Sequence, residues 1–78
     1  MKQLLDFINS MTPENQKAFA ARIGTSVGYL RKAISAKQTF GAGLCVNIER
    51  ESGGAIPCEV LDPSVDWAYL RSTFKQAA

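Results

Sequence analysis

Residues 16–35 of this 78-residue chain read QKAFAARIGTSVGYLRKAIS. Two short helical patterns meet in this stretch at Gly24, which has the backbone freedom that a tight turn between helices needs. In the first pattern, Phe19, Ala20 and Ile23 fall on one face. In the second, Ser26 is a good N-cap, and the face expected to be buried carries Val27, Leu30 and Ala33 or Ile34. The spacing predicts a helix-turn-helix over residues 14–36.

An αα-hairpin in a small helical bundle would show many of the same features. The position of Ala20 favours the helix-turn-helix, because a small residue is needed where the two helices cross. Polar residues also occupy the face that would meet DNA. The coincidence of small, glycine, apolar and polar positions therefore indicates a DNA-binding motif.

Basic residues concentrate in and around this motif. From Glu14 to Phe40 the chain has five basic residues and one acid, a net charge of +4, whereas the remainder has four basic residues and six acids, a net charge of −2. Such a cationic half is typical of a protein that binds a polyanion with one of its faces. A solvated helix surface would give the same count, so the charge points to DNA only together with the motif.

The rest of the chain also reads as helices. Thr12 and Pro13 form a helix start, and the pair Gly53-Gly54 is expected to end a helix. We predict helices over residues 2–10, 13–23, 26–36, 42–52 and, with Asp62 as N-cap, about 63–76. Residues 56–61 alternate like a strand, but a lone strand would have nothing to pair with, so a short helix is favoured. The predicted fold class is all-α, with five or six helices in a single domain over residues 1–78.

The chain has two cysteines and no histidine, which limits the metal-binding and catalytic chemistry that it could carry out. Cys45 and Cys58 have apolar neighbours and are expected to be reduced core residues, since a zinc site would need more ligands. We expect no cofactor, no metal and no enzymatic activity. The first apolar stretch is interrupted by Asp6 and Asn9 and lacks a cleavage site, and no apolar run could span a bilayer. The expected location is the cytoplasm.

The segment SVGYLRK, from Ser26 to Lys32, is similar to the Ser-x-x-Tyr-Leu recognition helices of phage repressors of the Cro and lambda-repressor type, in the broad XRE helix-turn-helix family. The resemblance covers about Leu4 to Leu61. The later stretch GGAIPCEVLDPSVDW, residues 53–67, resembles a narrower group, the prophage Cro-like regulators called YdaS, which are often labelled as antitoxins. The resemblance implies a lambda-repressor-like fold and a repressor that binds double-stranded operator DNA.

The resemblance also assigns roles at the DNA. It implies that Gln16 binds a phosphate, that Ser26, Val27 and Gly28 approach base edges, and that Lys32 follows one turn later. The glutamines frequent in the family are absent here; valine can pack on a thymine methyl, whereas glycine only permits close approach. From their chemistry, the residues expected at phosphates are Tyr29, Arg31, Lys37, Gln38 and Thr39. Tyr29 could instead cover the helix crossing, Arg31 could be solvated surface, and Val27 could belong to the core.

Aromatic and apolar residues near the C-terminus call for a separate explanation. Either these residues, Trp67, Leu70 and Phe74, complete the core, or they form an interface with a second copy or a partner. Phe40, expected to be exposed in its loop, is a second candidate residue for such an interface. A single helix-turn-helix reads few base pairs, so a homodimer is expected, at least on DNA. The alternative function is an antitoxin that neutralises a toxin protein through its C-terminal region. An RNA-binding role has no matching signature.

Overall fold

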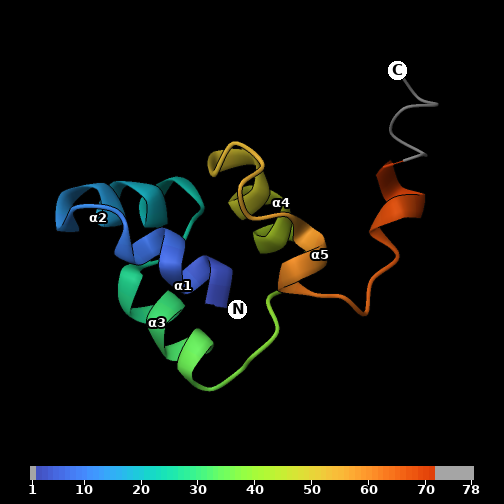
Figure 1. Cartoon of the computed structure of the whole chain (residues 1–78), viewed down its shortest axis with the longest axis horizontal. Helices are drawn as coiled ribbons and strands as arrows, with labels where there is room; N and C mark the ends of the chain where they lie inside the picture. The colour runs from blue at the N-terminus through green and yellow to red at the C-terminus, as the bar shows by residue number, and fades with distance from the viewer. Residues whose placement is uncertain (1, 72–78) are drawn as a thin grey trace.

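The computed structural model describes residues 2–71, and every regular element in that range is a helix (Figure 1). The all-α prediction is therefore confirmed. The short helix favoured over a strand near residue 58 is present, and the first four helices begin and end within a residue or two of the predicted positions. The elements are α1 (Lys2–Asn9), α2 (Pro13–Arg22), α3 (Val27–Ser35), α4 (Ala42–Glu51) and α5 (Cys58–Leu61), followed by a helical segment over residues 67–71.

Local side-chain hydrogen bonds fix the starts of α2 and α3. The Thr12 hydroxyl accepts a hydrogen bond from the backbone N–H of Asn15 at 3.2 Å, and Pro13 opens α2. The Ser26 hydroxyl accepts one from the backbone N–H of Tyr29 at 3.1 Å. Each N-cap satisfies a backbone donor that the helix itself leaves without a partner. The two predicted helix starts are thus confirmed.

The turn between α2 and α3 depends on Gly24. Its φ is +84°, in the left-handed region that favours glycine. The chain returns through this turn so that Ala20 and Leu30, each about 1% exposed, enter the same core. The small Ala20 side chain lies where α2 meets α3, and the backbone N–H of Thr25 closes the turn on its carbonyl at 2.9 Å.

One hydrophobic core collects side chains from every helix of the described residues. Cys45 and Cys58 belong to it, with free thiols. Burial raises the pKa of both thiols, that of Cys58 to about 11, so both stay protonated near neutral pH. The expectation of reduced core cysteines is therefore confirmed. The other buried members are Leu4, Ile8, Phe19, Ala20, Ile23, Leu30, Ala33, Phe40, Ile48, Ile56, Leu61 and Trp67.

The C-terminal helical segment starts later than predicted. Instead of capping a helix at Pro63, the Asp62 carboxylate binds the backbone N–H and the hydroxyl of Ser64, at 3.1 and 2.6 Å, which holds a turn. The helix begins at residue 67, where Asp66 accepts a hydrogen bond from the backbone N–H of Tyr69 at 3.1 Å. The predicted start near residue 63 is wrong because a second aspartate provides the cap. The predicted end lies outside the described residues.

Candidate nucleic-acid interface

α3 divides cleanly into a buried and an exposed face. Leu30 and Ala33 are in the core, and Val27 is half-buried against it. Ser26 lies exposed at the start of the helix, and a Cβ built on Gly28 would meet no atom within 4 Å. The exposed face therefore brings together, on one side of the helix, five of the ten residues predicted to meet DNA: Ser26, Gly28, Tyr29, Arg31 and Lys32.

The cations of residues 2–71 fall into two groups by their partners. Arg22 and Arg50 both pair with Glu51, and Arg71 pairs with two glutamates. The second group makes no ion pair among the described residues, and all of its members lie in α1, α2, α3 or the loop after α3. No ion pair among the described residues compensates their charge. This group is Lys2, Lys17, Arg31, Lys32 and Lys37.

Two hollows lie at opposite ends of α3. The first, of about 330 Å³, is lined by Lys17 of α2 and by the residues that begin α3, Thr25 to Gly28. The second, of about 440 Å³, is lined by Lys2 of α1, by residues 37–39 after α3, and by apolar side chains that include Leu61. Both hollows have an unpaired lysine in their wall.

Three polar residues that line these hollows were not among the residues predicted to bind DNA: Lys2, Lys17 and Thr25. For Lys17 and Thr25 a signal was available. Lys17 lies off the apolar face defined by Phe19 and Ala20, and Thr25 directly precedes the N-cap. For Lys2 no local pattern pointed to α3, because 35 positions separate it from Lys37 and only the tertiary fold brings the two to one hollow.

Both the amide nitrogen and the amide oxygen of the Gln16 side chain make hydrogen bonds within the protein. Its side-chain NH₂ donates to the carbonyl oxygens of Ile8 and Met11, at 2.9 and 3.1 Å, just where α1 ends. Its Oε1 accepts a hydrogen bond from an Nη of Arg31 at 3.4 Å. Both amide hydrogens are used, so in this structure no Gln16 donor is left for a phosphate. The exposed Arg31, held beside Gln16, is the group at this position that can reach one.

The loop after α3 presents Lys37, Gln38 and Thr39 to solvent, as predicted for phosphate-binding residues. Lys37 has a φ of +56°, a conformation uncommon for residues other than glycine. Phe40 closes the loop and is only 3% exposed, so its prediction as an exposed anchor is wrong. Its ring lies 6.4 Å from that of Tyr29, which remains 47% exposed. An apolar ring ending a polar loop is more stable in the core than in water.

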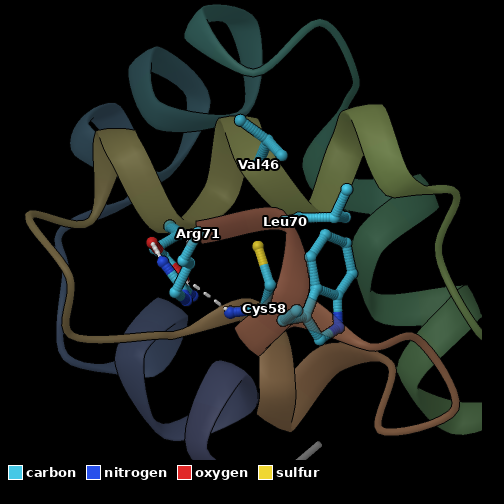
Figure 2. Close-up of a pocket in the computed structure, with 6 residues that line it drawn as sticks. Val46, Cys58, Leu70 and Arg71 are labelled. Carbon is cyan, nitrogen blue, oxygen red and sulfur yellow. Dashed lines mark hydrogen bonds and ion pairs between the residues drawn. The ribbon is translucent and has the colours of Figure 1, made fainter. Parts of the chain in front are cut away.

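A second surface lies on the other side of the molecule, between α4 and the segment 67–71. An apolar groove of about 190 Å³ lies there. Figure 2 shows Val46, Cys58, Leu70 and Arg71, four of the residues that line it. Val46 and Leu70 are 46% and 44% exposed. Trp67 lines the groove but is 5% exposed, and its Nε1 donates to the carbonyl of Asp62 at 2.7 Å.

Of the predicted interface residues, only Leu70 is therefore exposed in the described part of the chain. The core alternative holds for Trp67, because an indole that is already packed and hydrogen-bonded cannot also anchor a partner. Phe74, the last predicted interface residue, lies outside the described residues.

Arg71 attaches this C-terminal segment to the body of the protein. Its guanidinium binds the Glu49 carboxylate at 2.5 and 2.9 Å and that of Glu59 at 2.7 and 3.1 Å. Glu49 also accepts a hydrogen bond from the backbone N–H of Cys58 at 2.8 Å. The Arg71 hydrogen bonds, and then the backbone one, lower the pKa of Glu49 to about 2. Glu49 thus joins α4, α5 and the segment 67–71.

The helices between residues 2 and 71 are all too short or too polar to cross a bilayer.

Comparison with known proteins gives one informative similarity. No protein-family model and no solved structure matches the chain. Over 56 residues the chain is 38% identical to a protein of Escherichia coli (strain K12) named "Putative transcriptional regulator YdaS". The match covers 72% of this chain and 57% of that protein, so the chain spans little more than half of its relative's length. This identity supports a relationship to a family of regulators.

Proposed function

We propose that the protein is a sequence-specific DNA-binding transcriptional regulator, and that α2, the turn at Gly24 and α3 act as a helix-turn-helix. The observation that carries the proposal is the exposed face of α3 and the loop after it, which hold three of the five cations that make no ion pair among residues 2–71. The name of the Escherichia coli relative supports a regulatory role. In this proposal α3 enters the major groove, where a helix can reach base edges.

The exposed residues then have separate tasks. Lys32 donates to the O6 or N7 of guanine, Ser26 binds a base edge or a phosphate, and Val27 packs on a thymine methyl. Gly28 lets the helix approach closely. The phosphate contacts are assigned to Tyr29, Arg31, Lys37, Gln38 and Thr39, with Arg31 taking the place that the resemblance gave to Gln16.

The wider proposal follows from the resemblance to Cro-like prophage regulators. We assign the protein the role of a repressor in the cytoplasm, with no enzymatic activity and no cofactor. Because a single α3 reads only a few base pairs, two copies would bind two half-sites about one helical turn apart.

Fluorescence anisotropy with labelled duplexes tests the proposal. The native protein is titrated against DNA from upstream of its own gene and against a scrambled duplex of equal length, at two salt concentrations. We expect binding to the upstream DNA at least about a thousandfold tighter than to the scrambled DNA. Affinity for both should fall steeply with salt. Absence of binding to either duplex at low salt would refute DNA binding.

A pair of charge-matched variants tests the assignment of α3. Lys32→Gln removes an unpaired cation from the proposed base-reading face, whereas Arg50→Gln removes a cation that is already paired with Glu51 on the far side. We expect Lys32→Gln to reduce discrimination between the two duplexes and Arg50→Gln to leave it unchanged. Equal effects of both variants would show that α3 is not the reading helix.

The groove in Figure 2 favours a second candidate function, the binding of a partner protein such as a toxin. Val46 and Leu70 offer exposed apolar surface beside a groove, which is typical of interaction sites. Co-expression with the product of the neighbouring gene, followed by co-purification, tests this function. Val46→Asp should abolish the complex and leave the binding of a single half-site intact. A complex that survives Val46→Asp would exclude this groove.

A further inference from the structure

We infer that the hollow at the C-terminal end of α3 holds a phosphate of the DNA backbone, and that Lys2 of α1 contributes to this contact together with Lys37. The inference rests on the proposed function and extends it to a helix that has no place in the helix-turn-helix. The two lysines are distant in sequence but line the same hollow, and neither has a carboxylate partner among residues 2–71.

The chemistry of the hollow fits a phosphate. Its two lysines supply positive charge, and the exposed Gln38 and Thr39 in its wall supply an amide and a hydroxyl donor. The remaining wall is apolar and includes Leu61. An anion in such a site meets ammonium groups from two separate parts of the chain, α1 and the loop after α3.

The spacing of the two hollows fits the DNA. α3 has nine residues, so its axis is about 13 Å long. One hollow lies at each end, and the B-DNA major groove is about 12 Å wide. With α3 in the major groove, a hollow at either end of the helix can reach the sugar-phosphate backbone that borders the groove. Lys17 and Ser26 would then contact the backbone at one end of α3, and Lys2 with Lys37 would contact it at the other.

The test compares Lys2→Gln, Lys37→Gln and the double variant with Arg50→Gln as control, in the full chain. We expect Lys2→Gln to weaken binding to upstream and scrambled duplexes by the same factor. In the double variant, the slope of log K against log salt should fall by about 0.9, because the phosphate that the two lysines share is then no longer contacted. If the two lysines share one phosphate, the double variant should lose less than the product of the two single losses. Arg50→Gln should retain the native slope.

Single methylphosphonate substitutions along each strand locate the contact. Neutralising one phosphate should weaken the native protein but not the Lys2→Gln, Lys37→Gln double variant. A native affinity and salt slope in Lys2→Gln, or a methylphosphonate effect that persists in the double variant, would overturn the inference while the proposed function stands. If the native protein binds no duplex at all, the result refutes the proposed DNA-binding function, and the inference that rests on it is refuted as well. Circular dichroism of each variant confirms that it is folded.

Discussion

Gln16 is a connecting residue between three helices. Its amide group binds two carbonyls at the end of α1, and its oxygen accepts from Arg31 on α3. Helix ends leave carbonyls without intrahelical partners, so a side chain that binds two of them stabilises the junction. The same contacts hold Arg31 near the proposed DNA surface.

Replacing Gln16 should therefore affect stability as well as binding. Gln16→Leu leaves the carbonyls of Ile8 and Met11 without these donors, and we expect a loss of about 1–3 kcal/mol in the free energy of unfolding. Urea denaturation measures the loss. Gln38→Leu, at an exposed position, is the control and should change stability by less than about 0.5 kcal/mol. Similar losses in both variants would refute this role of Gln16.

Ser26 has two tasks that a pair of substitutions can separate. Ser26→Ala removes the hydrogen bond to the N–H of Tyr29 and should cost about 1 kcal/mol of stability. Ser26→Asp keeps a good N-cap but places a negative charge on the proposed DNA face. We expect it to retain near-native thermal stability while losing DNA binding. Native affinity in Ser26→Asp would show that this end of α3 lies away from the phosphates.

The turn between α2 and α3 is set by one glycine, whereas a second glycine nearby has no such task. Gly24 has a left-handed φ, and an alanine there should destabilise the protein by about 1–2 kcal/mol. Gly28 lies in α3 with open space around it, so an alanine there should stabilise the helix by about 0.5–1 kcal/mol. Thermal unfolding of Gly24→Ala and Gly28→Ala should therefore shift in opposite directions. Shifts of the same sign would contradict this assignment.

Local chemistry explains which elements could be predicted from sequence. The caps at Thr12 and Ser26 and the turn at Gly24 depend on neighbours within a few residues, and these were predicted correctly. The start of the last helix was predicted wrongly, because Asp62 and Asp66 both suit an N-cap and tertiary packing decides between them.

The environment of aromatic side chains depends on the whole fold. Phe40 was expected in solvent because its loop is polar, but the chain folds back and buries it near Tyr29. Half of the predicted DNA-facing residues do share one side of α3, since helical periodicity alone places them there. Lys2 could not be found this way, because only the packing of α1 brings it to the end of α3.

At the scale of the whole molecule, paired and unpaired charges are separated. The glutamates of α4 and α5 neutralise the arginines around them, and the unpaired cations lie on α1 to α3 and the following loop. Within residues 2–71, the cations without an ion-pair partner therefore lie on the half proposed to meet DNA. A net charge of +2 conceals this separation.

The glutamate at the centre of the paired half gives stability a specific pH dependence. The pKa of Glu49 is about 2 in the folded protein, below its ordinary value of 4.5, so its ionised form favours folding above about pH 4.5. This contribution should be lost as the pH falls from about 4.5 toward about 2. Urea denaturation across this range should show a shallower loss for Glu49→Gln than for the native protein. Glu14→Gln, an exposed control, should follow the native curve.

Trp67 is the chain's single tryptophan, and its burial has a practical consequence. An indole in an apolar site emits at shorter wavelength than one in water, and this indole lies between the helical body and the segment that Arg71 attaches. The wavelength of its emission maximum therefore reports whether the segment 67–71 is in place, without any added label. Because α3 contains no tryptophan, a spectrum that stays unchanged while DNA is bound would show that the far side of the protein is undisturbed by the contact.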